Sequence, residues 1–526
     1  MRHRRSERRF LGAGTLWQNF LPSFIVVREI RSEGGQITRW MEEDPGLPIK
    51  FGPCSNAEYD PDPLTPVMLE AIKRARAEIE RNARRTGMSR RQFLLSLCGA
   101  ATTLMALNAC TRDEMKREPG GTYEVSPEAT VDEDAAREAL GGEEFIFDIQ
   151  GHLLEYDLNR AVNSEGAEFW SFFPQQDCGA DDPRDCFSIE QFLDLMFIRS
   201  DTSMVVISAL PIAPDGSPLS LEVMEETRRV AEALCRDDRI LLHAQALPNV
   251  GKLQANMDAM EAVVRSHPIK AWKVFTNYPD LYLHNDDAWR FDDADPNLAQ
   301  VGEAFIEKAI EVGVPTICAH KGLSSGSPYA TPADVGGAAR KHPDANFVIY
   351  HSGFDRTVEG PYTKATADIG INRLITSMKE NGVGPNENVY AELGSTWWYI
   401  MRSPEQAAHV IGKLLKYVGE DNVLWGTDCL FYGSPQDQIQ MLRTLSISEE
   451  FQERYGYPKL TKEIKAKILG LNGAKLYGVE PVARCEFTRR ELERMRKSLP
   501  GRNQALGPRT PAEAALFRSH HEGWPG

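Results

Sequence analysis

The apolar positions of this chain are grouped into eight short runs between residues 145 and 426. The runs are rich in β-branched and aromatic residues, as buried strands are, and cover 145–149, 203–209, 239–244, 269–275, 314–319, 346–350, 388–393 and 422–426. Between several runs the apolar residues recur with helical spacing, in 221–234, 253–266, 297–312 and 403–418. Strands that alternate with helices in this way predict a (β/α)8 barrel of the TIM type, with a doubly wound open sheet as the alternative.

Several of these runs end in side chains that can bind a metal ion. The first leads into Gln150 and His152, and later runs end at His320, His351 and Asp428. In a parallel α/β fold the C-terminal ends of the strands converge on one face, so these residues can share a ligand. Imidazole and carboxylate are ligands of Zn, Fe, Mn and Ni, and the pattern therefore predicts a transition-metal site.

The chemistry expected of such a site is the activation of water. A bound divalent metal lowers the pKa of its water from about 15.7 toward about 7, so that hydroxide is present at neutral pH. Asp428, on a Gly-Thr-Asp turn, could bind the metal and orient that water. His351 could polarise the substrate or transfer protons.

The strand-end motifs resemble a known family. His351-Ser-Gly353, Trp425-Gly-Thr-Asp428 and the closing segment 468–478 follow one another in the order found in the amidohydrolase superfamily. The resemblance covers about residues 143–480 and is closest to the amidohydrolase-related branch that includes aminocarboxymuconate-semialdehyde decarboxylase. It implies a distorted barrel with one divalent metal, usually zinc, and a small-molecule substrate that is carboxylated, cyclic or aromatic.

The resemblance also implies roles for individual residues. His152, His320 and Asp428 would be metal ligands, with Asp428 and His351 as the catalytic residues. The expected activity is that of a metal-dependent hydrolase on a small carboxylated or cyclic substrate. Non-oxidative decarboxylation at the same metal is one alternative, and a non-catalytic barrel that binds a ligand is another.

One position departs from the family pattern. Gln150 stands where the family usually has a histidine, and its carbonyl oxygen is a weaker ligand for a transition metal. We retain Gln150 as a fourth candidate ligand. Lys273, within the fourth run, is a candidate bridge to a second metal, although contact with a substrate carboxylate or a salt bridge is preferred. Glu392 is expected to pair with Lys273 or a substrate group, and His243 to belong to the core.

The N-terminal part contains a possible export signal. Residues 1–87 form an extension that is expected to be partly disordered, with a loop over 46–65 and a helix over 65–85. Ser89-Arg-Arg-Gln-Phe-Leu94 resembles a twin-arginine motif, and 88–110 contains the apolar segment of such a signal. Cys110 ends a sequence similar to a lipoprotein cleavage site, which would allow a lipid anchor. We therefore expect export by the twin-arginine route to the periplasm. A cytoplasmic location, with 88–110 as an ordinary helix, is the alternative.

The remaining boundaries follow from composition. Residues 111–142 are charged and rich in Gly and Pro and predict a linker, whereas 143–480 is expected to form the barrel. The aromatic insertion 157–200 is expected to be a lid or pocket wall, or a satellite hydrophobic cluster. The tail, 481–526, is expected to wrap around the barrel or to be partly disordered.

Charge and apolar content exclude two classes of partner. With 60 Lys and Arg against 76 Asp and Glu, the net charge of −16 argues against a nucleic-acid surface. No apolar run reaches the roughly 20 residues of a membrane-spanning helix. The nine cysteines do not form a disulfide framework; Cys178 and Cys186 flank a polar loop and could pair, but free thiols are expected. We also expect a homo-oligomer.

Overall fold

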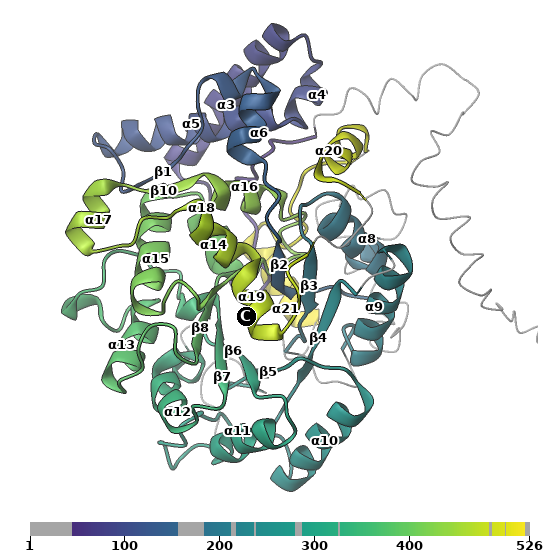
Figure 1. Ribbon diagram of the computed structural model, residues 1–526, viewed down its shortest axis with the longest axis vertical. Coiled ribbons are helices and arrows are strands. Elements are labelled where there is room, and N and C mark those ends of the chain that lie inside the picture. Colours follow the sequence, from purple (N-terminus) through teal and green to yellow (C-terminus); the bar gives the residue numbers. More distant parts are fainter. Residues whose placement is uncertain are drawn as a thin grey trace, which may run out of the picture. The chain divides into compact units, whose positions relative to one another are not determined.

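The computed structural model describes residues 45–155, 183–211, 217–235, 238–278, 287–323, 327–482, 487–499 and 501–520. Within these ranges eight parallel strands are hydrogen-bonded to one another in chain order, from β2 to β9 (Figure 1). They are β2 (Phe147–Gly151), β3 (Met204–Ile207), β4 (Ile240–Gln245), β5 (Ala271–Phe275), β6 (Thr316–His320), β7 (Asn346–Tyr350), β8 (Val389–Glu392) and β9 (Val423–Leu424). Each strand overlaps one of the eight predicted apolar runs.

The last strand returns to the first and closes the ring. The Ile149 amide donates to the Trp425 carbonyl at 3.0 Å, and the Asp428 amide donates to the Gln150 carbonyl at 2.9 Å. Gly151 forms a parallel bridge with Cys429. The sheet is therefore a barrel, as predicted, and the open doubly wound sheet is excluded.

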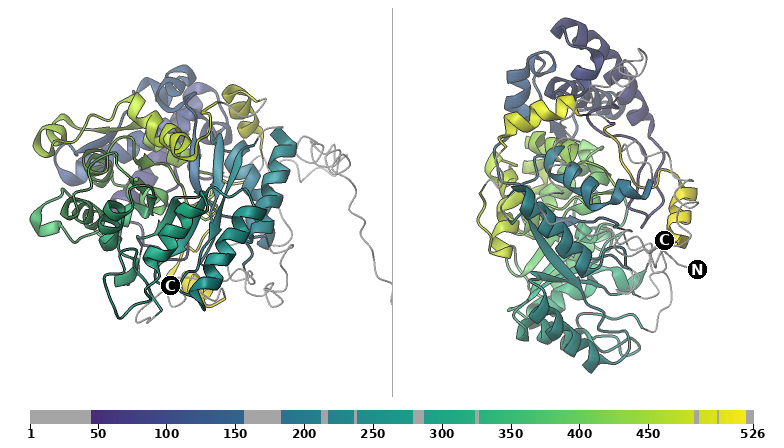
Figure 2. Two further views of the ribbon diagram at one scale, coloured as in Figure 1. Left: turned by 60° about the horizontal axis from the view of Figure 1, so that its bottom comes forward. Right: turned by 90° about the vertical axis from the view of Figure 1, so that its right-hand side faces the viewer.

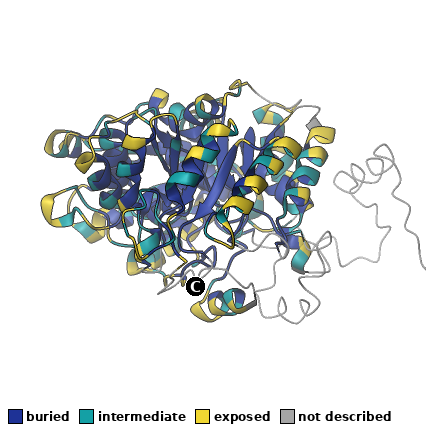
Figure 3. Cartoon of the chain, turned by 90° about the horizontal axis from the view of Figure 1, so that it is seen from below, coloured by how far each residue is buried: buried dark blue, intermediate teal, exposed yellow. Residues whose placement is uncertain are grey.

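Helices surround the barrel and bury the strands (Figures 2 and 3). They are α8 (Ile189–Leu193), α9 (Leu221–Cys235), α10 (Leu253–Ser266), α11 (Gly302–Glu311), α12 (Val335–Lys341), α13 (Asn372–Glu380), α14 (Gly394–Ile400), α15 (Pro404–Tyr417), α16 (Gln436–Thr444), α17 (Glu449–Tyr455), α18 (Lys462–Ala466) and α19 (Asn472–Tyr477). Apolar side chains such as Phe147, Ile149, Val206 and Leu241 form one buried cluster inside the barrel. Gly473 of α19 packs directly against Phe147 and Ile149, so α19 covers this cluster.

Helices that precede the barrel pack together beside a small antiparallel sheet. They are α3 (Pro66–Thr86), α4 (Arg90–Leu94), α5 (Leu97–Met115) and α6 (Glu133–Leu140), and the sheet pairs β1 (Gly121–Tyr123) with β10 (Leu445–Ile447). The predicted first helix begins where expected, because the Thr65 side chain caps it and Pro66 occupies its first turn. The segment 111–142, expected to be a linker, contains β1 and ends in the short helix α6, and both elements pack against the body.

The twin-arginine-like segment is folded into this part of the protein. Ser89 and Gln92 form a capping box at the start of α4. Phe93 is fully buried, and Arg91 donates to the Leu499 carbonyl at 3.1 Å. Cys110 on α5 is 4% exposed. Among the described helices, none is both long enough and apolar enough to cross a membrane.

The close contact between α4 and α5 gives a direct test of this packing. A Cβ atom on Gly99 would lie 2.3 Å from the Phe93 carbonyl oxygen, which belongs to the backbone and cannot turn away. We expect Gly99→Ala to lower the free energy of unfolding by about 1–3 kcal/mol, measured by denaturant titration. Gly337→Ala, where the nearest atom is 3.7 Å away, is the matched control. Equal stability of the two variants would contradict a folded role for this segment.

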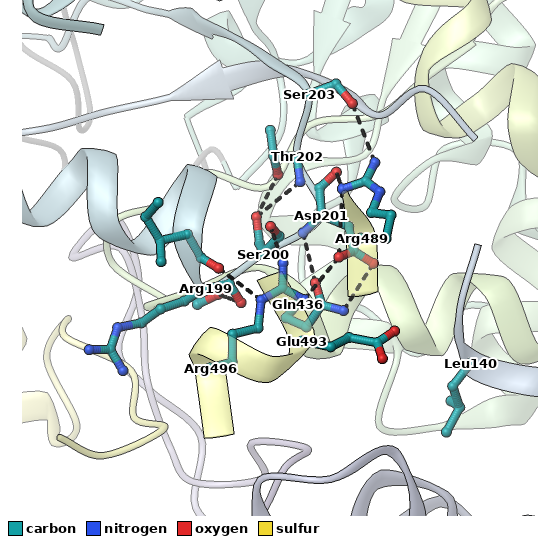
Figure 4. A network of polar contacts seen from close by, with 12 residues as sticks. Leu140, Arg199, Ser200, Asp201, Thr202, Ser203, Gln436, Arg489, Glu493 and Arg496 are labelled. Atoms are coloured by element: carbon teal, nitrogen blue, oxygen red, sulfur yellow. Dashed lines mark hydrogen bonds and ion pairs between the residues drawn. The ribbon is translucent and has the colours of Figure 1, made fainter. Parts of the chain in front are cut away.

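The C-terminal helices α20 (Arg489–Ser498) and α21 (Pro511–His520) lie at separate places on the body (Figure 2). Arg489 and Arg496 of α20 point toward Asp201, just before β3 (Figure 4). Arg496 pairs with Asp201 at 2.9 Å, and Arg443 of α16 pairs with it at 2.6 Å. Burial alone would raise the pKa of Asp201, but the three arginines outweigh it and hold the pKa well below its usual value. This carboxylate therefore joins the tail to the barrel.

Two further expectations concern the insertion 157–200 and the cysteines. Of the insertion 157–200, the aromatic part lies outside the described residues, and 183–198 forms short helical turns that include α8. Cys186 is disulfide-bonded, so the prediction of a free thiol there was wrong. Its expected partner, Cys178, lies outside the described residues. The side chains of Cys54, Cys98, Cys110, Cys318 and Cys429 are free thiols.

Candidate metal centre

The predicted ligands meet at the C-terminal end of the barrel. Gln150, His152, Lys273, His320 and Asp428 line one small pocket. They come from β2, from the turn that follows it, from β5, from β6 and from the turn after β9. All five are at least 96% buried. Closure of the ring thus brings together residues that are as far apart in sequence as positions 150 and 428.

One group of side chains is centred on Asp428. His152 Nε2 lies 3.2 Å from Asp428 Oδ1, and the Gln150 amide donates to the same oxygen at 3.2 Å. His152 is oriented from behind by the Ser208 carbonyl, 2.7 Å from its Nδ1. Ser395 donates to the second Asp428 oxygen. Gln150 is therefore a hydrogen-bond donor to the carboxylate in this structure.

A second group is centred on a residue that the sequence did not reveal. Glu58 Oε1 lies 2.8 Å from His320 Nε2, and Glu58 Oε2 lies 3.8 Å from His351 Nε2. Among the described residues, these three form a group whose ligand atoms all lie within 4.8 Å of one another and could hold a metal ion. The His320 ring stacks on Phe275, with ring centroids 5.2 Å apart, which fixes its orientation.

Asn56 joins the two groups. Its side-chain amide donates to Glu58 at 2.7 Å and to Asp428 at 2.7 Å. Asn56 and Glu58 both belong to the segment before α3, which was predicted to be a loop. Between them, Ala57 has φ +71°, a left-handed conformation that non-glycine residues rarely adopt. This turn directs two buried polar side chains into the barrel.

Backbone strain is also found at both predicted catalytic residues. His351 has φ +60° and Asp428 has φ +55°, and neither is glycine. Such conformations cost on the order of 1–3 kcal/mol and are concentrated at functional sites. At the ends of β7 and β9 this left-handed conformation directs the side chains of His351 and Asp428 into the mouth of the barrel.

Several polar atoms converge beside Gly394. A Cβ atom at this glycine would lie 2.5 Å from Gln150 Oε1, 2.8 Å from His351 Nδ1 and 2.9 Å from Glu392 Oε1. Each of these buried atoms makes no hydrogen bond with another group of the described protein. Buried polar atoms are normally satisfied, so an unpaired cluster indicates a place for a ligand or a transferred proton.

The surrounding charges set the protonation of the site. Burial alone would raise the pKa of Asp428 and of Glu58, but the neighbouring histidines and hydrogen bonds outweigh it, and both pKa values fall. Burial lowers the pKa of His351 to about 3. Burial raises the pKa of Glu392 well above its usual value, which favours the protonated form of this carboxyl.

The remaining candidates lie deeper in the barrel. Burial lowers the pKa of Lys273 to about 8, and its Nζ lies 3.5 Å from the centre of the Tyr350 ring. His243 bonds to Tyr350 at 3.1 Å and to Tyr477 at 2.7 Å, consistent with the predicted core role. Glu392 accepts from the His351 amide at 3.0 Å. Among the described residues, no ion pair joins Lys273 to Glu392.

The barrel can now be compared with known proteins. Residues 221–479 match a family model described as amidohydrolase. This part of the chain belongs to the amidohydrolase family. The match confirms the resemblance expected from the strand-end motifs. None of the curated proteins matches this chain.

Solved structures share the barrel at low identity. An uncharacterised TIM-barrel protein from Bordetella bronchiseptica is 12% identical, with a TM-score of 0.40 over 63% of this chain and 98% of its own. 2,6-Dihydroxybenzoate decarboxylase from Rhizobium is 14% identical, with a TM-score of 0.37 over 64% and 98%. 4-Oxalomesaconate hydratase from Rhodopseudomonas palustris is 16% identical, with a TM-score of 0.37 over 63% and 95%. At these values the comparison concerns the fold and gives no information on the substrate.

Proposed function

We propose that this amidohydrolase is a metal-dependent enzyme that acts on a small carboxylated substrate. The observation that carries the proposal is the buried group Glu58, His320 and His351, with its ligand atoms within 4.8 Å of one another. Two imidazoles and one carboxylate, with a further carboxylate at Asp428, suit a divalent transition metal, and we propose zinc. A bound ion would supply a fixed positive charge that polarises the reacting carbonyl or carboxylate.

The surroundings of His351 give separate support for a bound ion. Neither ring nitrogen of His351 makes a hydrogen bond with another group of the described protein, although the ring is fully buried. A buried imidazole without partners is costly unless a ligand satisfies it. The side chains of His320 and Glu58 are held in place by Phe275 and Asn56.

Within this activity we propose non-oxidative decarboxylation as the reaction. Loss of CO₂ leaves an electron pair on carbon, and the site must then deliver a proton to it. Burial raises the pKa of Glu392 and so favours its protonated form, and its oxygen without a hydrogen bond faces the same point as His351 Nδ1. Glu392 is therefore the proposed donor of this proton, at the point beside His351 Nδ1.

Hydrolysis is the second candidate. It requires a group that accepts a proton from water, with a pKa near the working pH. Asp428 and His351 are placed for this role at the strand ends, but their pKa values are lowered, and that of His351 falls to about 3. Both groups are consequently weak bases, which favours decarboxylation.

Isotope labelling separates the two reactions. Purified protein loaded with Zn²⁺ or Mn²⁺ would be incubated with a panel of hydroxylated aromatic and small unsaturated carboxylic acids. We expect release of CO₂ and, in D₂O, deuterium at the carbon that lost the carboxylate. Incorporation of ¹⁸O from labelled water would instead establish hydrolysis. Metal binding without turnover of any substrate would support the non-catalytic alternative.

Gln150 gives a further prediction. We expect Gln150→His to lower kcat more than about 10-fold with little change in bound metal, because the amide that donates to Asp428 is lost. Steady-state kinetics and metal analysis of the purified variant test this. Gln254→His, on the exposed surface of α10, is the control. A rise in both activity and metal content would mark Gln150 as a defect in the site.

A further inference from the structure

The segment before α3 crosses the mouth of the barrel and enters the site. Asn56 is 2% exposed and Glu58 is 6% exposed, although the segment has no regular secondary structure. Their side chains contact His320, His351 and Asp428, which lie at the C-terminal ends of three different strands. Residues 45–63 are called the strap below.

Long-range contacts fix the strap to the barrel. Lys50 forms a buried ion pair with Asp437 at 2.6 Å and also donates to the Ser434 carbonyl at 2.8 Å. The side chains of this pair are 5% and 0% exposed. Next to Glu58, the Tyr59 hydroxyl bonds to the Tyr432 hydroxyl at 3.0 Å. Breaking a buried pair of this kind is strongly destabilising, and together with the Tyr59 contact the pair anchors the strap on both sides of Glu58.

The C-terminal tail covers the strap from outside. Asn503 donates to the Leu47 and Pro48 carbonyls, each at 2.8 Å. Arg518 of α21 donates to the Ala57 carbonyl at 3.2 Å and pairs with Asp60 at 2.9 Å. These contacts hold the strained turn at Ala57 that directs Glu58 inward. The strap and the C-terminal tail that covers it therefore form one wall of the site.

The charges explain why a carboxylate is needed from outside the barrel. At the end of β2 the position expected to carry a ligand holds the neutral Gln150, which donates to Asp428 and brings no charge. Glu58 places a carboxylate between His320 and His351 instead. The matched family model begins at residue 221, so Glu58 lies outside it.

We propose that Glu58 is a resident metal ligand, which the strap supplies in place of a ligand at position 150. The proposal rests on the proposed metal-dependent function. It has a consequence for the twin-arginine-like segment 88–110, which lies between Glu58 and the barrel in sequence. Cleavage at Cys110 would separate the ligand from the rest of the site. The active protein therefore keeps residues 45–110 on the same chain as the barrel.

Metal titration tests the role of Glu58. We expect Glu58→Gln to weaken the binding of Zn²⁺ by more than about 10-fold, measured by calorimetry and by metal content after dialysis. Glutamine preserves the size of the side chain and can still accept from Asn56. Glu380→Gln, at the exposed C-terminal end of α13, makes the same chemical change away from the site and should bind Zn²⁺ as the unchanged protein does. The double variant Glu58→Gln/Gln150→Glu should recover binding, because it returns one carboxylate to the site.

The outcomes distinguish this inference from the proposed function. If His320→Ala loses Zn²⁺ while Glu58→Gln retains it, the metal site stands and Glu58 is not a ligand. If Glu58→Gln retains Zn²⁺ and gains activity, the strap is a plug that occupies the place of a substrate carboxylate, and the proposal is overturned. If the unchanged protein binds neither Zn²⁺ nor Mn²⁺, the proposed function itself fails.

The expectation that the active protein keeps residues 45–110 is tested by mass spectrometry. The full-length gene would be expressed in a host with a twin-arginine export system, and the active fraction would be analysed by intact mass spectrometry. We expect a single chain that includes residues 45–110. An active species that begins at or near Cys110, with no N-terminal fragment bound, would overturn the inference.

Discussion

Replacement of His320 by alanine is expected to lower the affinity for Zn²⁺ by more than about 100-fold and to abolish turnover. Loss of outer-shell partners of a metal site already costs about 10- to 100-fold, and His320 is the group closest to Glu58, at 2.8 Å. Its removal leaves Glu58 and His351 without the third ligand of their group. Metal content after dialysis and activity with saturating metal measure the two effects.

Stability must be separated from metal binding in this experiment. His320 stacks on Phe275, so its loss also leaves a small void. His320→Asn keeps a polar side chain that is too short to replace Nε2 and should show the same loss of Zn²⁺. His267→Ala removes a partly exposed histidine that pairs with Glu225 and should keep both metal and activity. Full metal content in either His320 variant would contradict the proposed site.

The second large effect concerns the folded state. We expect Asp201→Ala to lower the free energy of unfolding by about 3–5 kcal/mol, because its removal leaves buried arginines without their shared carboxylate. The Asp201 side chain is 6% exposed, and those of Arg443 and Arg496 are 5% and 14% exposed. Denaturant titration followed by fluorescence and circular dichroism measures the loss. Limited proteolysis should show that α20 is released first.

A surface substitution provides the reference for this prediction. Asp344→Ala changes an exposed aspartate between α12 and β7 and should alter stability by less than about 0.5 kcal/mol. Asp201→Asn keeps the hydrogen-bonding shape without the charge and should fall between the two. If Asp201→Ala is as stable as Asp344→Ala, the arginines are not held by this carboxylate.

The barrel and most of its site follow from local sequence. Eight apolar runs predicted eight strands. Each run is almost continuously apolar, as a strand buried on both faces is, and each ends where a turn begins. Parallel strands place their C-terminal ends on one face, so His152, His320 and Asp428 could be assigned to one site before their positions were known. The Gly-Thr-Asp turn and the departure at Gln150 were also visible in the sequence.

The first helix shows how far local signals extend. Thr65 and Pro66 mark its start, and Gly87 ends it in a left-handed conformation, as capping chemistry predicts. The segment 111–142 has the composition of a linker, yet β1 pairs with β10, more than 320 residues later in the chain. Composition reports local preference and does not reveal a partner strand at that distance.

The sequence by itself determined the barrel, the order of its strands and the polar residues at their ends, because these depend on periodicity and on the geometry of parallel sheets. Only the tertiary structure placed Asn56 and Glu58 among them. The strap has no periodic pattern, and its position is set by contacts such as Lys50 with Asp437, which are 387 residues apart. Contacts of this range carry no signal in the neighbouring residues, so a buried carboxylate that completes the site resembled part of an ordinary loop.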